Sequence, residues 1–354
     1  MKIGGASTRS IWVEPDGWSV GIFDQRRLPW AIERLVLRSV EDAAVAIADM
    51  ATRGAPLIGA VAAYGLALGL RADPGDEALA ITYDRLLATR PTAVNLRWAL
   101  DRMRRQVMPL APALRVAHAY AEAARLCDED VAMNRAIGVA GLPLIEAIAA
   151  RKGGAPVNIL THCNAGWLAT VDWGTATAPL YLAHDAGLPL HIWVDETRPR
   201  NQGALTALEL AEHGVPHTYI ADNAGGLLMQ QGRVDMVIVG TDRVTANGDV
   251  CNKIGTYLKA LAAKAHDIPF VVALPAGTYD PETATGADVE IEKRSPDEIA
   301  FTTGRTLAGD QATIALTASP ACNPAFDVTP AALVSAYITN VGLIATAGQL
   351  TQLA

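Results

Sequence analysis

Short apolar runs alternate with helical segments through the second half of the chain, and no other feature constrains the fold as strongly. Five runs rich in Val, Ile and Leu predict strands at residues 157–161, 190–194, 217–221, 236–240 and 270–274. Nearly continuous apolar strands separated by helices are typical of a parallel sheet that helices cover on both faces. We therefore predict an α/β fold with a Rossmann-like, doubly wound parallel sheet.

The first third of the chain has a different pattern. Residues 11–38 alternate apolar and polar side chains, which predicts a small antiparallel sheet. The period then becomes helical, and helices are predicted at 40–50, after Pro56, at 77–88, at 93–108, and at 113–150 with an interruption at 138–143. We expect a smaller β plus helical cap domain at residues 1–125 and a Rossmann-like catalytic domain at 126–354, with the boundary inside the long helix.

Composition argues against several classes of partner. The net charge is −8 and Lys and Arg form no run, so we expect neither nucleic acid nor an anionic membrane as a partner. The longest uncharged apolar run, 55–70, is shorter than the roughly 20 residues that cross a bilayer, and it predicts a buried helix. The amino terminus shows no signal-peptide pattern, and the four cysteines form no CxxC pair. A reducing cytoplasm is the expected location.

Polar loops follow four of the predicted strands, and such loops converge on one crevice in a parallel sheet. Cys163 is the first candidate in them, because a thiol at a strand end beside a possible helix start suits acid–base or nucleophilic chemistry. The alternative is a small buried hydrophobe. Asp242 is the second candidate, as a proton donor or acceptor whose pKa partial desolvation would raise. The alternatives for Asp242 are a helix N-cap and an ion pair with Arg243.

His162 adjoins Cys163, but neighbouring residues at an extended strand end point to opposite sides. We therefore expect a structural or indirect role for His162, and no Cys–His dyad. The histidines form no HExxH motif, so no metal site is predicted. No GxGxxG follows the first predicted strand and no GxxxxGK[ST] occurs, so nothing indicates a dinucleotide or P-loop site.

Three predicted helix starts carry a cation that suits phosphate. The segment Arg53-Gly54-Ala55-Pro56 precedes an apolar helix, where glycine admits a ligand to the backbone, the first amides point at an anion and Arg supplies a forked donor. Lys253, after Asn252, and Arg90 precede two further helices. Each is also compatible with a surface charge at a helix end, but three together favour a phosphorylated ligand.

Long motifs follow one another in order through nearly the whole chain. They are Arg53-Gly54-Ala55-Pro56, Arg90-Pro91-Thr92-Ala93-Val94-Asn95, Thr161-His162-Cys163-Asn164-Ala165-Gly166, Glu196-Thr197-Arg198-Pro199, Gln202-Gly203-Ala204, Gly240-Thr241-Asp242-Arg243, Asn247-Gly248-Asp249, Asn252-Lys253-Ile254-Gly255-Thr256 and Asn323-Pro324-Ala325-Phe326-Asp327-Val328-Thr329-Pro330. Together they resemble the motifs of the 5-methylthioribose-1-phosphate isomerase family, from the Ser10-Ile11-Trp12 region to a carboxyl-terminal helix at Pro330.

The resemblance implies an aldose–ketose isomerase of methionine salvage that converts 5-methylthioribose 1-phosphate into 5-methylthioribulose 1-phosphate. It implies no metal and no organic cofactor, and a homodimer. By position, Cys163 and Asp242 would be the catalytic pair. The residues that would hold the substrate and its phosphate are Arg53, Gly54, Ala55, Arg90, Gln202, Asn252 and Lys253.

The same fold family includes proteins of other function. These are regulatory subunits of a eukaryotic translation-initiation exchange factor, and isomerases for ribose 1,5-bisphosphate and 5-deoxyribose 1-phosphate. A regulatory subunit would not need Cys163 and Asp242, so their joint presence argues for an enzyme. Two departures from the family pattern are Thr241, where many relatives have alanine, and Trp167, where a smaller residue is common. Trp167 bears on pocket shape, and therefore on the C5 substituent of the sugar.

Overall fold

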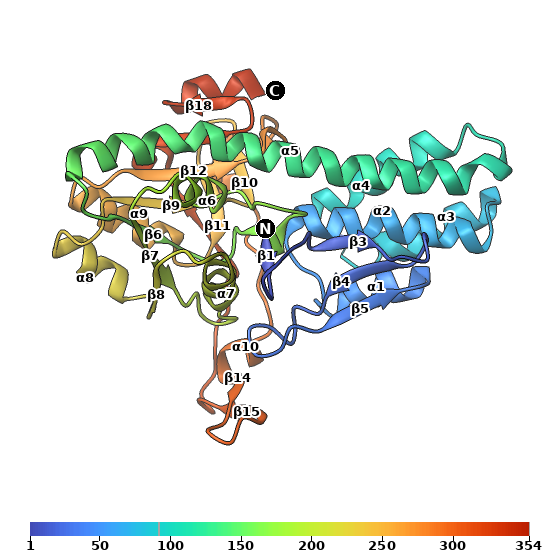
Figure 1. Cartoon of the computed structure of the whole chain (residues 1–354), viewed down its shortest axis with the longest axis horizontal. Helices are drawn as coiled ribbons and strands as arrows, with labels where there is room; N and C mark the ends of the chain where they lie inside the picture. Colours follow the sequence, from blue (N-terminus) through green and yellow to red (C-terminus); the bar gives the residue numbers. More distant parts are fainter. Residues whose placement is uncertain (91–92, 354) are drawn as a thin grey trace. The chain divides into compact units, whose positions relative to one another are not determined.

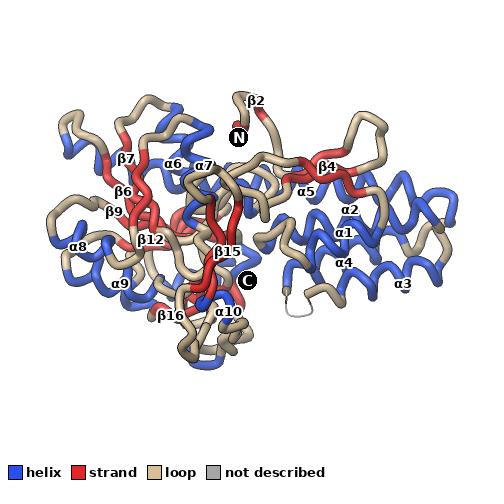
Figure 2. The backbone as a smooth tube through the Cα atoms, turned by 90° about the horizontal axis from the view of Figure 1, so that it is seen from below, coloured by secondary structure: helices blue, strands red, loops and turns tan. Residues whose placement is uncertain are grey.

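A computed structural model describes residues 1–90 and 93–353 (Figure 1 and Figure 2). It divides into two compact units. The first comprises Met1, Ala6–Met133 and Gly166–Gly174, and the second Lys2–Gly5, Asn134–Ala165 and Thr175–Ala354. The long helix α5 (Pro112–Lys152) contributes to both units. Our division of the chain at residue 125 stays a prediction.

The first unit contains the small antiparallel sheet predicted for residues 11–38. Its strands are β3 (Ile11–Val13), β4 (Val20–Phe23) and β5 (Arg34–Leu37), in that order. Ile11 pairs with Ile22, and Val20 pairs with Leu37. All four side chains are buried, so this face of the sheet covers the core of the unit. Of the two short strands at the start of the chain, β2 (Ala6–Ser7) belongs to this unit and β1 (Lys2–Ile3) to the second.

The helices predicted for the first unit are confirmed with small shifts in their ends. They are α1 (Val40–Ala48), α2 (Ala55–Ala72), α3 (Asp76–Leu87), α4 (Val94–Val107) and the first part of α5. Helix α1 begins at a capping box, in which the Ser39 hydroxyl accepts a hydrogen bond from the Asp42 amide and the Asp42 carboxylate accepts one from the Ser39 amide. Such reciprocal bonds satisfy amides that the first helical turn leaves without partners.

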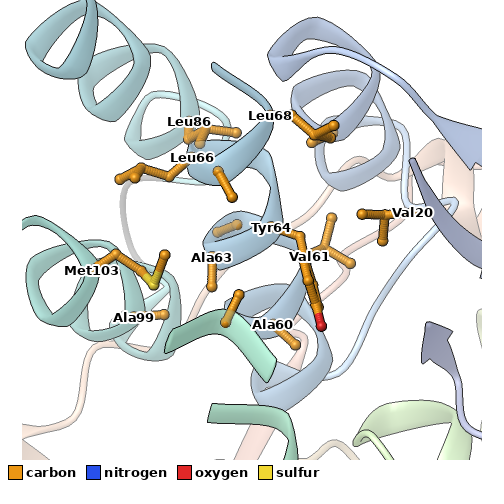
Figure 3. Close-up of a cluster of buried hydrophobic side chains, with 14 of the residues drawn as sticks. Val20, Ala60, Val61, Ala63, Tyr64, Leu66, Leu68, Leu86, Ala99 and Met103 are labelled. Atoms are coloured by element: carbon orange, nitrogen blue, oxygen red, sulfur yellow. The ribbon is translucent and has the colours of Figure 1, made fainter. Parts of the chain in front are cut away.

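Helix α2 is the centre of this unit. By length and hydropathy it could cross a membrane, as could α5, but 78% of its residues are buried inside the structure. Figure 3 shows Ala60, Val61 and Tyr64 of α2 in a cluster with Val20 of the sheet, Leu86 of α3 and Met103 of α4. The prediction of a buried core helix over this apolar run is therefore confirmed.

Helix α5 is continuous, and the interruption predicted at residues 138–143 is wrong. The two glycines there are contact points, because a Cβ on Gly138 would lie 2.9 Å from Leu182 Cδ1 and one on Gly141 would lie 2.6 Å from Pro179 Cγ. Both neighbours belong to α6 (Ala178–Asp185). Pro143 lies inside the helix. Glycine and proline weaken a helix locally, but tertiary packing overrides that propensity.

The second unit is built on a seven-stranded sheet in the order β18-β17-β12-β9-β6-β7-β8. In chain order its strands are β6 (Val157–Thr161), β7 (Leu190–Asp195), β8 (His217–Ile220), β9 (Met236–Val239), β12 (Phe270–Leu274), β17 (Ala336–Thr339) and β18 (Gly342–Ile344). All neighbours pair in parallel except β17 with β18. Numbered along the chain, the parallel strands follow the Rossmann order 3-2-1-4-5-6. The predicted fold class is confirmed.

Helices cover both faces of this sheet. On one face, Leu160, Val237 and Val272 join a cluster with Leu228 of α8 (Ala224–Gln230) and with Ala260 and Ala263 of α9 (Thr256–Ala265). On the other face, Gly141 of α5 approaches Ile338 of β17, and α6 packs against β7. Helix α7 (Gly203–His213) packs beside β7 and β8. The sheet is therefore doubly wound.

Several elements near the carboxyl terminus were not predicted. They are β17 and β18, a second sheet of β10 (Arg243–Thr245), β11 (Val250–Lys253), β13 (Tyr279–Asp280) and β16 (Phe326–Thr329), the short helix α10 (Asp297–Ala300), and a hairpin of β14 (Phe301–Arg305) and β15 (Gln311–Ala315). The helix expected at Pro330 is wrong, because only a short 3₁₀ turn (Ala331–Leu333) occurs there before β17. Further 3₁₀ turns span Trp167–Ala169, Ala276–Thr278, Gly286–Asp288 and Ala347–Leu353.

The tight packing of α2 against α3 yields a stability prediction. A Cβ on Gly69 would lie 2.5 Å from Thr82 Oγ1 and 2.6 Å from its Cγ2, so Gly69→Ala must displace the Thr82 side chain of α3. We expect the free energy of unfolding in urea to fall by about 1–3 kcal/mol. Gly226→Ala in α8 is the matched control, because its Cβ would meet nothing within 4 Å and alanine favours helix by up to about 1 kcal/mol. Equal stability of the two variants would contradict the prediction.

Candidate functional site

Cys163 lies just beyond the end of β6 in a backbone conformation that is unusual for its residue type. Its φ angle is +67°, in the left-handed region that side chains other than glycine rarely adopt. Its amide donates to Thr197 Oγ1 at 2.8 Å, and its carbonyl accepts from Thr206 Oγ1 at 2.8 Å. Both partners lie at or after the end of β7. The half-buried thiol is thus held in place by a neighbouring loop and by α7.

Asp242 follows β9, the strand that pairs with β6 at the centre of the sheet. Strand order reverses at this pair, and in such sheets ligands bind in the crevice beyond the strand ends at that point. Gly240 brings the two loops together, because a Cβ there would lie 2.6 Å from Ala165 Cβ. The sequence-based expectation that Cys163 and Asp242 leave strands at one crevice therefore agrees with the observed topology.

The expected desolvation of Asp242 is wrong, because the residue is exposed. It lies beyond the strand, in a turn that leads to β10, and its amide donates to the Cys251 carbonyl at 3.0 Å. No helix begins at Asp242, which excludes the N-cap alternative; the residues that follow it form β10. Arg243 forms an ion pair with Asp280 at 3.0 Å.

Gln202 and Lys253 line one small recess in the second unit, together with Pro199, Arg200, Ile254, Arg294, Glu298, Asn323 and Ala325. Gln202 precedes α7, and its buried Oε1 has no hydrogen-bond partner among the described residues. The Lys253 ammonium lies 4.5 Å from the centre of the Phe326 ring. Asn252 is buried next to it and donates to Thr256 Oγ1 at 3.0 Å. The structure therefore brings the predicted residues Gln202 and Lys253 to one recess, whereas Asn252 does not belong to its lining.

Arg53, Gly54 and Ala55 belong to the first unit, at the start of α2. Gly54 has φ +92°, and a Cβ there would overlap the Ala169 backbone, so only glycine fits. Ala55 is exposed at the first turn of α2, where Pro56 follows it. Arg90, also in the first unit, is half-buried, whereas Pro91 and Thr92 of its motif lie outside the described residues.

Trp167 packs inside the first unit and is 1% exposed. Its ring meets Phe23 edge to face, with 6.0 Å between the ring centres. Aromatic pairs of this geometry stabilise a core beyond their buried area. The position that departs from the family pattern is therefore a core residue of that unit.

A buried polar cluster beneath Cys163 was not found from the sequence. His162, Asp195 and Lys259 are 1%, 0% and 4% exposed. The Nδ1 atom of His162 lies 3.0 Å from Asp195 Oδ2, and Nε2 lies 2.9 Å from the Ile254 carbonyl oxygen. The Lys259 ammonium lies 3.1 Å from the same Asp195 oxygen and donates to the Asp222 carbonyl at 2.7 Å. Lys259 comes from the first turn of α9, where no sequence motif marks it.

This cluster also contains the one set of potential metal ligands found among the described residues. His162, Asp195 and Asp222 each offer one ligand atom, and these three atoms lie within 4.8 Å of one another. The Lys259 ammonium already neutralises Asp195. Because the lysine already provides a positive charge for these carboxylates, the group resembles a hydrogen-bonded ion cluster more than a metal site.

Burial shifts the pKa of two further acidic groups near the site. Burial raises the pKa of Asp327, although its carboxylate accepts hydrogen bonds from the amides of Gly255 and Tyr257 at the start of α9. Burial also raises the pKa of the Cys251 thiol to about 12, and the negative charge of Asp242 acts in the same direction. Cys251 is therefore a neutral thiol at physiological pH, as expected for a packing residue.

Comparison with known proteins identifies relatives over nearly the whole chain. A family model described as "Initiation factor 2 subunit family" matches residues 51–346. A methylthioribose-1-phosphate isomerase of Acidiphilium cryptum is 62% identical over 98% of this chain and 95% of that protein. The protein of the same name from Rhodospirillum centenum is 59% identical over 98% of this chain and 93% of its own length.

Two solved structures are similar at the level of the whole fold. The 5-methylthioribose 1-phosphate isomerase of Pyrococcus horikoshii superposes with a TM-score of 0.86 at 38% identity, covering 98% of this chain and 95% of that one. A structure described as translation initiation factor eIF-2B, subunit delta, from A. fulgidus has a TM-score of 0.84 at 39% identity, covering 98% of this chain and 100% of that one.

The different burial of the cysteines predicts two classes of thiol. Burial raises the pKa of Cys127 and Cys251 to about 12, so at pH 8 only about one molecule in 10⁴ carries either thiolate. Cys163 is half-buried and Cys322 exposed. We expect a disulfide reagent to modify Cys163 and Cys322 in the native protein, and Cys127 and Cys251 only after unfolding. The Cys322→Ser variant should therefore show one reactive thiol in the native state. Four equally reactive thiols would contradict this.

Proposed function

This chain belongs to the Initiation factor 2 subunit family, and on that premise we propose that it is an aldose–ketose isomerase of methionine salvage. Its substrate would be 5-methylthioribose 1-phosphate and its product 5-methylthioribulose 1-phosphate. The observation that carries the proposal is the 62% identity, over 98% of the chain, to a protein named methylthioribose-1-phosphate isomerase.

The reaction needs a base for carbon and an acid for oxygen. Phosphate on C1 removes the free aldehyde, so the ring must open while the phosphate stays attached. In our proposal the Cys163 thiolate takes the proton of C2, the electron pair forms a C1=C2 double bond, and the C1–ring oxygen bond breaks. The ring oxygen takes a proton from Asp242. Positioned acid–base groups suit such transfers.

The second half of the reaction returns both groups to their first state. The Asp242 carboxylate takes the proton of the 2-hydroxyl as the C2 carbonyl forms, and Cys163 gives its proton to C1. Every proton removed is replaced, so the net change is an isomerisation. The position of Cys163 and Asp242 after the paired strands β6 and β9 supports this division of labour.

We propose substrate-binding roles for the remaining predicted residues. Arg53 and Arg90 would supply forked donors to the phosphate, and the backbone amides of Gly54 and Ala55, at the start of α2, would donate to it as well. Lys253 adds a buried cation. Gln202, whose Oε1 has no partner among the described residues, and Asn252 would bind sugar hydroxyls. A buried polar atom without a partner gains most from a ligand that completes its hydrogen bonding.

The proposed assembly rests on the family resemblance, and the proposed location rests on the cysteine pattern. We propose a homodimer in the cytoplasm, with a small-molecule sugar phosphate as its ligand and without nucleic acid or membrane as partners. The net charge of −8 supports the absence of a nucleic-acid partner.

A regulatory role is the second candidate, and one observation favours it. The structure described as an eIF-2B delta subunit is as similar to this chain in fold and in identity as the solved isomerase is. Likeness of fold therefore does not separate an enzyme from a regulatory subunit. The higher identity to the bacterial isomerases does favour the enzyme.

The two functions differ in a direct assay, which also tests the catalytic pair. Purified protein with EDTA, offered the methylthio, deoxy and 5-phospho sugar 1-phosphates in parallel, should turn over the methylthio sugar fastest. Cys163→Ser and Asp242→Asn should each lower kcat by about 10²–10⁴-fold. Cys322→Ser, at an exposed cysteine, should retain activity. Inactivity on all three sugars would favour the regulatory role. Near-normal turnover by Cys163→Ser or by Asp242→Asn would show that the substituted residue is not catalytic.

The isotope content of the product tests the route of the hydrogen. If the half-buried Cys163 thiol carries the proton from C2 to C1, it can exchange with solvent during turnover. We therefore expect deuterium at C1 of the product formed in deuterium oxide, measured by proton NMR or mass spectrometry. Product without deuterium would favour a direct hydride shift from C2 to C1, with Cys163 shaping the pocket, or a proton relay that is sealed from solvent.

A further inference from the structure

We propose that His162 is the positioning residue of this site. Its ring, with a proton on each nitrogen, would join Asp195 to the Ile254 carbonyl and hold Cys163 in its left-handed conformation. The inference rests on the proposed catalytic role of Cys163. It adds a function for a side chain that takes no part in the reaction itself.

The hydrogen-bond partners of His162 determine how many protons the ring carries. The Ile254 carbonyl oxygen can only accept, so Nε2 must donate to it. Asp195 Oδ2 lies 3.1 Å from the Lys259 ammonium, which has only donors, so this oxygen is an acceptor as well. Both hydrogen bonds of the ring can form only when Nδ1 and Nε2 are both protonated.

The charges around the ring support this state. Asp195 is completely buried, and its Oδ1 has no hydrogen-bond partner among the described residues. Its charge is therefore compensated through Oδ2, by His162 and Lys259. Asp222 Oδ1 lies 3.8 Å from His162 Nδ1, and Asp327 caps the adjoining α9. A buried cationic ring is stabilised by such surroundings, whereas an uncompensated one is not.

The cluster connects four segments of the second unit, each at or after the end of a strand. His162 lies in the loop after β6, Asp195 ends β7, Asp222 follows β8 and Ile254 follows β11. Asp222 accepts hydrogen bonds from the amides of Thr197 and Arg198, each at 2.8 Å. The Thr197 hydroxyl in turn accepts from the Cys163 amide. A change at His162 therefore reaches Cys163 both along the chain and through Asp195, Asp222 and Thr197.

The backbone beside the cluster is strained at two residues, and this strain indicates which segments the cluster stabilises. Cys163 and Thr197 have φ angles of +67° and +63°, although neither is glycine. Such conformations persist only where the surroundings over-determine them, and they gather at functional sites. On the far side of the ring, a Cβ on Gly255 would lie 3.0 Å from His162 Cε1, so the ring fills its space. The geometry is that of a support which fixes the cysteine backbone.

The protonation of His162 can be measured in the unmodified full-length protein. Protein labelled with ¹⁵N-histidine, studied at pH 7.5 by long-range nitrogen–proton correlation, should show a signal from the His162 ring with protons on both nitrogens. Loss of that signal in His162→Gln assigns it. A His162 ring with one unprotonated nitrogen would overturn the proposal, and this result does not depend on any variant being active.

Kinetics then test whether the cluster positions the thiol. The glutamine of His162→Gln cannot bridge the Asp195 carboxylate and the Ile254 carbonyl. We therefore expect kcat to fall by about 10²-fold, which is the loss that a misplacement of about 1 Å can cause, and KM to change less than about threefold. Lys259→Met should show the same split. The matched control is His191→Gln, because His191 lies on the neighbouring strand β7 and its Nε2 contacts the Thr218 hydroxyl at 3.0 Å instead of the buried cluster.

Two outcomes separate this inference from the proposed function. If His162→Gln turns over like His191→Gln, or if KM rises as much as kcat falls, His162 does not position Cys163. If the unmodified protein isomerises none of the sugar phosphates, the proposed function fails, and the NMR measurement still decides the protonation of the ring. Should His162→Gln fail to fold, the unmodified protein and Lys259→Met carry the test.

Discussion

The parallel pairing of β6 with β9 is the interaction on which the rest of the site depends. Leu160 pairs with Val237 at the centre of the sheet, where the order of strands along the chain reverses. Loops that leave two such strands turn toward opposite faces and leave a crevice between them. Cys163 and Asp242 follow these two strands, so the fold itself supplies the place where a thiol and a carboxyl can act on one ligand.

Buried charged side chains hold the loops beside that crevice, and such side chains are uncommon in protein cores. His162, Asp195 and Lys259 are almost fully buried, and each would destabilise the fold without the others. Apolar side chains of similar size would give a simpler core, but they would not determine the direction of the loop backbones. Hydrogen bonds with fixed donors and acceptors do so, and they stabilise the left-handed conformations at Cys163 and Thr197.

The regular elements were predictable where local pattern and tertiary environment agree. The strands β6 and β12 have the predicted bounds, because apolar residues run without a break between turn residues. The pattern failed in α5, where Gly138 and Gly141 looked like helix breakers although they are contact points for α6. It also gave no sign of β17, which follows Pro330, where the family resemblance implied a helix. In each case a distant neighbour decided the outcome.

The sequence by itself determined the class of sheet, the buried helix α2 and the identity of the polar residues at the strand ends, because hydrophobic periodicity and residue chemistry are local properties. The tertiary structure alone decided that Asp242 is exposed and that Gln202 and Lys253 share a recess. It also decided that Lys259 of α9 reaches Asp195 beneath Cys163. These relations depend on the register of strands and on the packing of helices far apart in the chain, and no local pattern encodes a distance between them.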